Sequence, residues 1–301
     1  MSPTPRVAAA PISWGVSELP GWGHQISRQR VLGEMREIGF AATESGPPGY
    51  LPEAPRERRS LLQRYGLGLA AGFLATVLHD PAANGIAQIE VEARGLAASG
   101  ADAIVVAAAW PSADYDRRQR LSQEQWSRLQ EGLAAAEQIA AICGLTLAFH
   151  PHVGTAVQSA EDVETLLNRT DVNLCLDTGH IYLGGGDPTE VAATWGHRIR
   201  HVHLKNVDDR VASAFKAGEL SYSDAVRRGL YTTLGDGDLD IAGVVDRILG
   251  TGYTGWFVLE QDISLATEPE PNGGPITSAR ESLAFFRRVA GAKPDVTGIS
   301  T

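Results

Sequence analysis

The sequence contains very little cysteine, since Cys143 and Cys175 are the only two among 301 residues. Two cysteines do not make a disulfide framework, so we expect a protein of a reducing compartment, by default the cytoplasm. Long apolar runs are also missing. None approaches the roughly 18–20 residues that span a bilayer, and the opening residues MSPTPR lack the apolar core of a signal peptide. We therefore expect no membrane partner.

Blocks of lysine and arginine are the third missing feature. The formal net charge is −10, which makes nucleic acid and anionic membrane surfaces improbable partners. The hydrophobic share of 43% and the charged share of 21% are ordinary for a globular protein. A chain of this length can bury a large core and fits one α/β barrel.

Strand-like runs alternate with helical segments along the whole chain. We expect strands at residues 7–14, 40–44, 68–75, 103–107, 145–150, 172–177, 199–205 and 256–260. We expect helices at residues 27–39, 54–65, 87–99, 122–142, 159–167, 188–195, 239–249 and 277–290, with a long loop at 206–237. This order predicts an α/β fold, a single-domain (β/α)₈ TIM barrel over residues 1–301, with its core at about 7–290 and a C-terminal tail at about 291–301. An open doubly wound sheet is the alternative, but SWGVSE after the first strand is not a glycine-rich nucleotide turn.

The stretch 199–206, IRHVHLKN, carries the strongest functional signal. Alternation places His201, His203 and Lys205 on one face of the strand and apolar residues on the other. Three further predicted strands end in ionisable residues, namely His150, Asp177 and Glu260. Because strand ends meet at one mouth of a barrel, these residues predict a metal site there. A mixed set of imidazoles and carboxylates suits Mn²⁺, Co²⁺, Zn²⁺ or Fe²⁺.

Such an ion can act as a Lewis acid on a carbonyl and ease proton removal from the adjacent carbon. Glu44, at the end of the second predicted strand, is a candidate base, and Lys205 is a candidate to neutralise a developing enolate.

Several motifs together resemble the xylose isomerase-like barrel superfamily of sugar isomerases and epimerases, and in particular its inosose dehydratase branch. They are APISWGVSELPGWG, AATESGPPGYLP, FHPHVGT, LDTGH and HVHLKN. The resemblance places metal ligands on Asp177, His203 and Glu260. The family's fourth ligand, usually the Glu of an E-x-H pattern, falls on His150, with His152 at the pattern's His. A His in place of this Glu removes one negative charge, and His152 is the alternative fourth ligand. The usual H-x-K-D also becomes HLKN, with Asn206 in place of the acid.

The resemblance implies a dehydratase of inositol catabolism that uses Mn²⁺ or Co²⁺ and removes water from a keto-inositol through an enolate. Candidates for the proton transfers are Glu44, Lys205, His152 and His180. Candidates for the substrate pocket are His79, Trp110, Trp14 and Arg228.

Other functions remain open at this point. A ketose epimerase or sugar isomerase shares the enolate step, although an epimerase usually needs carboxylates on both faces of the carbon. A metal-dependent endonuclease would need more ligands and a basic face, and a non-catalytic binding barrel is a further alternative. The expected partner is a small polyol or keto-sugar, and the chain is a candidate for homo-oligomer formation.

Overall fold

Short runs of small and β-branched residues form the strands at the centre of the molecule. The computed structural model describes residues 4–111 and 119–291, and within them nine parallel strands form one sheet. The strands are β1 (Arg6–Ala9), β2 (Ala42–Thr43), β3 (Gly68–Leu69), β4 (Ala71–Thr76), β5 (Ala103–Ala108), β6 (Thr146–Phe149), β7 (Leu174–Asp177), β8 (Ile199–Leu204) and β11 (Trp256–Leu259). Their order in the sheet is β3-β2-β1-β11-β8-β7-β6-β5-β4.

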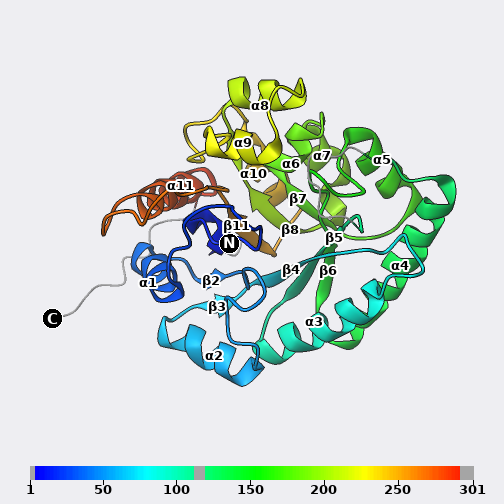
Figure 1. Cartoon of the computed structure of the whole chain (residues 1–301), viewed down its shortest axis with the longest axis horizontal. Coiled ribbons are helices and arrows are strands. Elements are labelled where there is room, and N and C mark those ends of the chain that lie inside the picture. Colours follow the sequence, from blue (N-terminus) through cyan, green and yellow to red (C-terminus); the bar gives the residue numbers. More distant parts are fainter. Residues whose placement is uncertain (1–3, 112–118, 292–301) are drawn as a thin grey trace.

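The sheet closes on itself at Ala70, between β3 and β4. The Ala70 N–H donates to Thr43 O at 2.9 Å, and its carbonyl accepts from the Asp102 N–H at 3.2 Å. Since β3 pairs with β2 and β4 pairs with β5, these two strands are halves of one barrel strand. The result is the predicted (β/α)₈ TIM barrel, with the helices arranged around the strands (Figure 1).

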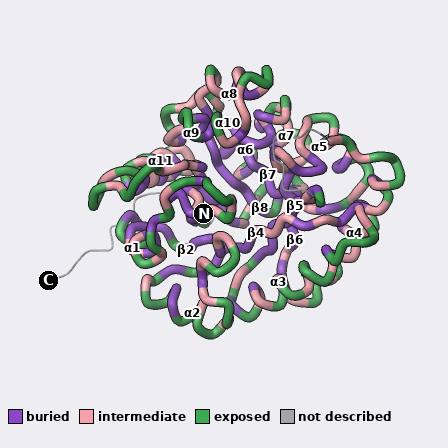
Figure 2. The backbone as a smooth tube through the Cα atoms, viewed as in Figure 1, coloured by how far each residue is buried: buried purple, intermediate pink, exposed green. Residues whose placement is uncertain are grey.

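The alternation predicted for residues 199–206 is confirmed, and the neighbouring strands follow the same period of two. The large apolar side chains on one face belong to the large core cluster, namely Leu147, Phe149, Leu174, Leu176, Val202, Leu204, Phe257 and Leu259. Side chains on the opposite face belong to two smaller clusters, which include Ala148, Cys175, Trp256 and Val258. Figure 2 shows the buried strands surrounded by helices whose outer faces are exposed. Each strand therefore turns every second residue toward the barrel axis and its mouth.

Several of the helices that follow the strands begin at recognisable caps. Ser122 and Ser159 each form a capping box, and Ser27 accepts from the Arg30 N–H. The helices between strands are α1 (Arg28–Ile38), α2 (Pro55–Arg64), α3 (Gly85–Ser99), α4 (Gln123–Ile142), α5 (Ala160–Arg169), α7 (Pro188–Trp195), α10 (Ile241–Gly250) and α11 (Pro275–Val289). All eight lie within a few residues of their predicted ranges. In the described part of the chain, none of the helices has both the length and the apolar character needed to cross a membrane.

Three predicted segments were wrong in detail. The first strand ends at Ala9, and a 3-10 helix, η1 (Pro11–Trp14), follows it, because Pro11 has no N–H to continue the strand ladder. The expected loops after β7 and β8 contain the helices α6 (Thr178–Leu183), α8 (Asp209–Lys216) and α9 (Tyr222–Arg227) and the hairpin of β9 (Asn206–Val207) and β10 (Tyr231–Thr232). Beyond Gly291, the expected C-terminal tail lies outside the described residues.

Asn206 fixes the segment that contains α8 and α9 to the barrel. Its buried amide donates from Nδ2 to Leu234 O at 2.8 Å, while Oδ1 accepts from the N–H groups of Val207 at 2.9 Å and Leu239 at 2.8 Å. A carboxylate has no N–H for the Leu234 carbonyl. Asn206 therefore suits this site because its side-chain amide can both donate to and accept from the surrounding backbone.

Candidate metal centre and substrate pocket

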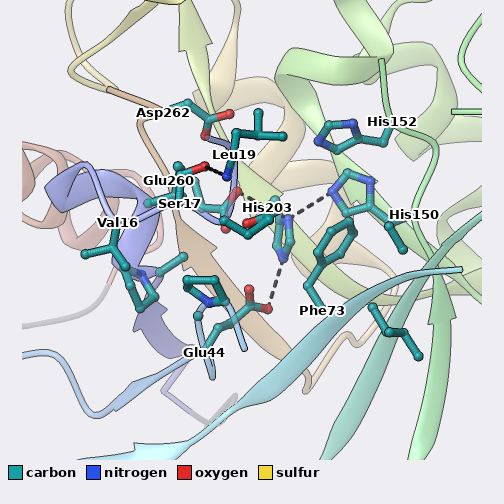
Figure 3. Close-up of a pocket in the computed structure, with 18 of the residues that line it drawn as sticks. Val16, Ser17, Leu19, Glu44, Phe73, His150, His152, His203, Glu260 and Asp262 are labelled. Carbon is teal, nitrogen blue, oxygen red and sulfur yellow. Dashed lines mark hydrogen bonds and ion pairs between the residues drawn. The ribbon is translucent and has the colours of Figure 1, made fainter. Parts of the chain in front are cut away.

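Four buried side chains from four neighbouring strands converge at the mouth of the barrel. Asp177 ends β7 and His203 lies in β8, while His150 and Glu260 directly follow β6 and β11. Nε2 of His150 lies 3.1 Å from Nδ1 of His203 and 3.5 Å from Oδ2 of Asp177. Nδ1 of His203 lies 3.6 Å from Oδ2 of Asp177 and 3.4 Å from Oε2 of Glu260. The structure thus brings together the four predicted ligands. Figure 3 shows three of them, His150, His203 and Glu260.

Hydrogen bonds on the far side of each imidazole fix its orientation. Nδ1 of His150 lies 2.8 Å from the Pro151 carbonyl, and Nε2 of His203 lies 3.0 Å from Oε1 of Glu44. Both partners are acceptors, so these ring nitrogens carry the protons. The remaining nitrogens, His150 Nε2 and His203 Nδ1, therefore point lone pairs toward each other and toward Asp177. Such an arrangement favours a positive charge at the common point, either a proton or a metal ion.

The spacing and chemistry of this donor set fit a divalent ion. Ligands about 2.1 Å from an ion in a tetrahedral arrangement lie about 3.4 Å from one another, close to the distances found here. The donor atoms of Asp177, His203 and Glu260 all lie within 4.8 Å of one another. Oδ2 of Asp177 is buried and accepts no hydrogen bond from a described residue. Two imidazole nitrogens and two carboxylates form a ligand set that is typical of sites for Mn²⁺, Co²⁺, Zn²⁺ and Fe²⁺.

Glu44 lies behind His203 and accepts from two imidazoles. In addition to His203, it accepts from Nε2 of His201 at 2.8 Å. Burial opposes ionisation of the Glu44 carboxyl, but the charges and hydrogen bonds of His203 and His201 outweigh burial and lower its pKa. Glu44 is therefore a carboxylate that holds His203 in one tautomer.

Lys205 is the cation nearest to the carboxylates among the residues described. Its Nζ lies 2.9 Å from Oδ1 of Asp262, 3.0 Å from Oε2 of Glu260 and 3.4 Å from Oδ2 of Asp177. Burial disfavours the ammonium, yet these three carboxylates outweigh it and raise the pKa of Lys205 well above its usual value. Lys205 is thus a permanent positive charge at the bottom of the pocket.

His152 and His180 pack against each other beside this ammonium, with their ring planes tilted by 39°. Their ring centroids are 3.7 Å apart, and Nε2 of His180 lies 3.3 Å from Nζ of Lys205. Nδ1 of His152 lies 2.7 Å from the Val153 carbonyl, so the proton is on Nδ1 and the lone pair is on Nε2. Burial is the largest effect that lowers the pKa of both rings well below the usual value.

The pocket above these residues has a volume of about 400 Å³. Seven predicted residues line it: Glu44, Trp110, His150, His152, His203, Lys205 and Glu260. His79 lies behind Trp110, with 4.7 Å between the ring centroids. Trp14 does not reach the pocket, because η1 turns it into the core, where its Nε1 donates to Oε2 of Glu34 at 2.7 Å. Arg228 is exposed at the C-terminal end of α9, away from the pocket wall.

Comparison with known proteins assigns this barrel to a family. The model of the family described as xylose isomerase-like TIM barrel matches residues 32–289. The chain belongs to this family. It is 33% identical, over 94% of both chains, to a protein of Geobacillus kaustophilus named inosose dehydratase. It is also 33% identical to the rhizopine catabolism protein MocC of Rhizobium meliloti, over 95% of this chain and 90% of the relative.

Solved structures share the fold. A crystal structure of a protein named IolI, which contains a bound zinc atom, matches 95% of this chain and 98% of its own with a TM-score of 0.69 and 15% identity. At 15% identity, this similarity shows a shared barrel fold. The resemblance inferred from the sequence motifs is thereby confirmed at the level of the family.

Within this family barrel, the sequence analysis missed two polar residues of the pocket. Asp262 pairs with Lys205 through Oδ1, and its Oδ2 accepts from the Tyr222 hydroxyl at 2.9 Å. Both residues are buried and line the pocket. A signal for Asp262 was present, because Glu260 and Asp262 are two residues apart, as are His150 and His152. Tyr222 gave no such signal, since its helix lies in a segment expected to be a loop.

Proposed function

We propose that this protein is a metal-dependent dehydratase that removes water from a keto-inositol. The observation that carries the proposal is the convergence of two oriented imidazole lone pairs and two carboxylates on one point at the bottom of the pocket. The curated relatives named inosose dehydratase, similar over nearly the whole chain, support the same substrate class. The small molecule would bind with its carbonyl toward the ligands and its hydroxyls along Lys205 and Asp262.

The residues that would hold the ion are His150, Asp177, His203 and Glu260, with Mn²⁺ or Co²⁺ as the proposed metals. When bound, the ion supplies Lewis acidity that polarises a ketone and makes the adjacent C–H bond more acidic. Glu44 would act as a positioning residue through His203.

In this proposal, His152 transfers the proton and Lys205 stabilises the negative charge that develops. Nε2 of His152 would accept the proton of the carbon next to the ketone, because Nδ1 is committed to the Val153 carbonyl. The nearby ammonium of Lys205 would stabilise the negative charge of the resulting enolate. His152 would then return the proton to the leaving β-hydroxyl, so that one C–H and one C–O bond break and one water forms. His180, packed against His152, would hold that ring in place.

A ketose epimerase is the second candidate, since it begins with the same proton removal. Epimerisation requires a second acid on the opposite face of the carbon. Glu44 would be the candidate for that group, but its Oε1 accepts from His201 and His203. This engagement favours dehydration.

The test is incubation of the metal-loaded protein with scyllo-inosose. A dehydratase yields a product 18 mass units lighter with a new ultraviolet absorption, which a chelator abolishes and Mn²⁺ or Co²⁺ restores. An isomer of unchanged mass would instead identify an epimerase. Turnover that continues unchanged after complete metal removal would contradict the proposed metal dependence.

Substitution of Glu44 by glutamine distinguishes a positioning residue from a base. We expect E44Q to bind the metal about 10–100-fold more weakly, because the partner that orients His203 is impaired. At saturating metal, kcat should stay within about tenfold of the parent protein. The measurements are metal titration by calorimetry and kcat at saturating metal.

A matched control is E34Q, which changes another buried glutamate, one that accepts from Trp14 and Arg30 outside the pocket. This variant should leave metal affinity unchanged. If E44Q keeps full metal affinity and loses more than a thousandfold in kcat, Glu44 is the base and not a positioning residue.

A further inference from the structure

Cys175 of β7 lies in the barrel interior, two residues before the proposed ligand Asp177. The register between β7 and β8 shifts at Leu174 and Cys175, so that Cys175 pairs with His201 and Asp177 pairs with His203. Irregularities of this kind often re-aim side chains close to a functional site. Cys175 and Asp177 therefore both face the interior that holds the proposed metal centre.

The sulfur of Cys175 belongs to a second group of donor atoms that overlaps the first. Sγ of Cys175 and one ring nitrogen each of His150 and His203 all lie within 4.8 Å of one another, and all three residues are buried. Around a tetrahedral zinc ion, nitrogen at about 2.1 Å and sulfur at about 2.3 Å place the ligands about 3.4–3.6 Å apart. A small contraction would therefore bring the three atoms onto one ion.

The two imidazoles and Asp177 are already oriented for such an ion. The far nitrogen of each ring is engaged by an acceptor, so the near nitrogens, His150 Nε2 and His203 Nδ1, remain for an ion 3.1 Å from each other. Oδ2 of Asp177 lies 3.5 Å and 3.6 Å from these two nitrogens. It is buried and accepts no hydrogen bond from a described residue, so it supplies a fourth donor.

Cys175 and Glu260 offer this centre two ligands of different chemistry. The Glu260 carboxylate lines the pocket and Cys175 does not, so an ion bound to the sulfur lies deeper in the barrel. Carboxylates suit Mn²⁺, whereas thiolates select softer ions such as Zn²⁺ and Cu⁺. Because His203 belongs to both groups of donors, an ion at one position excludes an ion at the other.

Packing alone gives no reason for a sulfur at this position. Cys175 shares its cluster with Ala71, Ala103, Val105 and Ala148, all of them small and apolar. A buried free cysteine can serve as a small apolar side chain, but alanine or valine would fill that role equally well. The property that the sulfur adds is a ligand atom within reach of two imidazoles.

We propose that His150, Cys175, Asp177 and His203 form a second metal position, which binds a thiophilic ion, Zn²⁺ or Cu⁺, below the substrate pocket. Binding replaces the thiol proton, which leaves to solvent, and no atom changes its oxidation state. The inference goes beyond the proposed function, since it requires neither substrate nor turnover. For the proposed dehydratase it means that Zn²⁺ or Cu⁺ displaces Mn²⁺ and inhibits.

Cadmium is the probe, because a thiolate bound to Cd²⁺ gives an ultraviolet charge-transfer band that nitrogen and oxygen ligands do not give. The metal-free protein is titrated with Cd²⁺ in the presence of a reductant that contains no thiol. We expect one such band, complete at one equivalent. In C175S the band should be lost and Cd²⁺ affinity should fall by at least about 100-fold, more than is usual when a group that only orients a ligand is changed.

Two further variants control for the fold and for the other cysteine. C175A should lose the band as C175S does, and its Tm shows that the core, which is rich in alanine here, is intact. C143S makes the same change at the half-buried Cys143 outside this group and should keep both the band and the Cd²⁺ affinity. Mn²⁺ affinity should fall much less than Cd²⁺ affinity in C175S, because Glu260 is the ligand that Mn²⁺ prefers.

The outcomes that overturn this inference are distinct from those that overturn the dehydratase. A band that persists in C175S and C175A, tight Cd²⁺ binding without a band, or Mn²⁺ and Cd²⁺ bound together would each contradict the second position. Failure to dehydrate scyllo-inosose would contradict the proposed function alone, since the band and the affinities need no turnover. If the Mn²⁺ protein is active, Zn²⁺ should inhibit it, and equal inhibition of C175S would also contradict the inference.

Discussion

Replacing Asp177 with asparagine should remove the metal ion and lower kcat/KM by roughly 200–5,000-fold. Oδ2 of Asp177 faces His150, His203 and Lys205 at 3.4–3.6 Å. Burial opposes the charge of this carboxyl, but Lys205 and the neighbouring histidines outweigh burial and hold its pKa well below the usual range. An amide there carries no charge, and loss of one partner from a buried charged cluster typically costs about 3–5 kcal/mol.

Asparagine is chosen because it preserves the structural role of this residue. Oδ1 of Asp177 caps α6 by accepting from the His180 N–H at 2.9 Å, and an amide oxygen can accept the same bond. Metal content after dialysis and the rise in Tm on metal addition are the measurements. D187N, the same change at the exposed cap of α7, should keep both. A D177N protein that retains one ion per chain would rule out the proposed ligand set.

The positions of these proposed ligands follow from the sequence because a barrel strand has a strict period of two. Apolar Val202 and Leu204 must face the helices, so His203 must face the axis, and the same reasoning places Asp177 and His150. The carboxyl ends of parallel strands then gather at one mouth. No contact information was needed to bring four distant residues together, because the fold class implied their meeting.

The limits of sequence reasoning appear where the chain leaves the strands. Trp14 lies at the end of the predicted first strand and is one of the pocket candidates, but Pro11 begins a 3-10 helix that turns the indole toward Glu34. Tyr222 reaches the pocket only because Ala225 and Val226 of α9 are buried in one cluster with Val153 and Val207, which follow the barrel strands β6 and β8. Such packing depends on tertiary contacts that periodicity does not encode.

The orientation of Glu44 is a further property that the strand pattern did not reveal. Its place at the mouth was predicted, and the pocket does include it. Its engagement by His201 and His203 depends on a register between β2 and β8, which are not adjacent in the sheet. The sequence therefore indicated which residues meet, while the hydrogen bonds suggest how the work is divided among them.

Replacing Lys205 with methionine is expected to lower kcat by about 100–1,000-fold, the usual loss when one donor to a developing negative charge is removed. Lys205 is buried, and its ammonium lies within 3.4 Å of three carboxylates. Its raised pKa keeps the charge on through the neutral range, so it would act as a fixed cation and not as a proton donor. Methionine fills a similar volume without the charge. The measurement is kcat at saturating metal and substrate.

Two comparisons separate this role from a structural one. K216M makes the same change at Lys216 of α8, which lies outside the pocket with its Nζ 3.8 Å from the ring centroid of Tyr182. This variant should leave kcat unaltered. K205R keeps the charge in a bulkier group and should recover part of the lost rate. Because the enolate charge develops only during reaction, kcat should fall much more than KM rises in K205M. If K205M keeps kcat within threefold at saturating metal and only KM changes, Lys205 binds the substrate but does not stabilise the enolate.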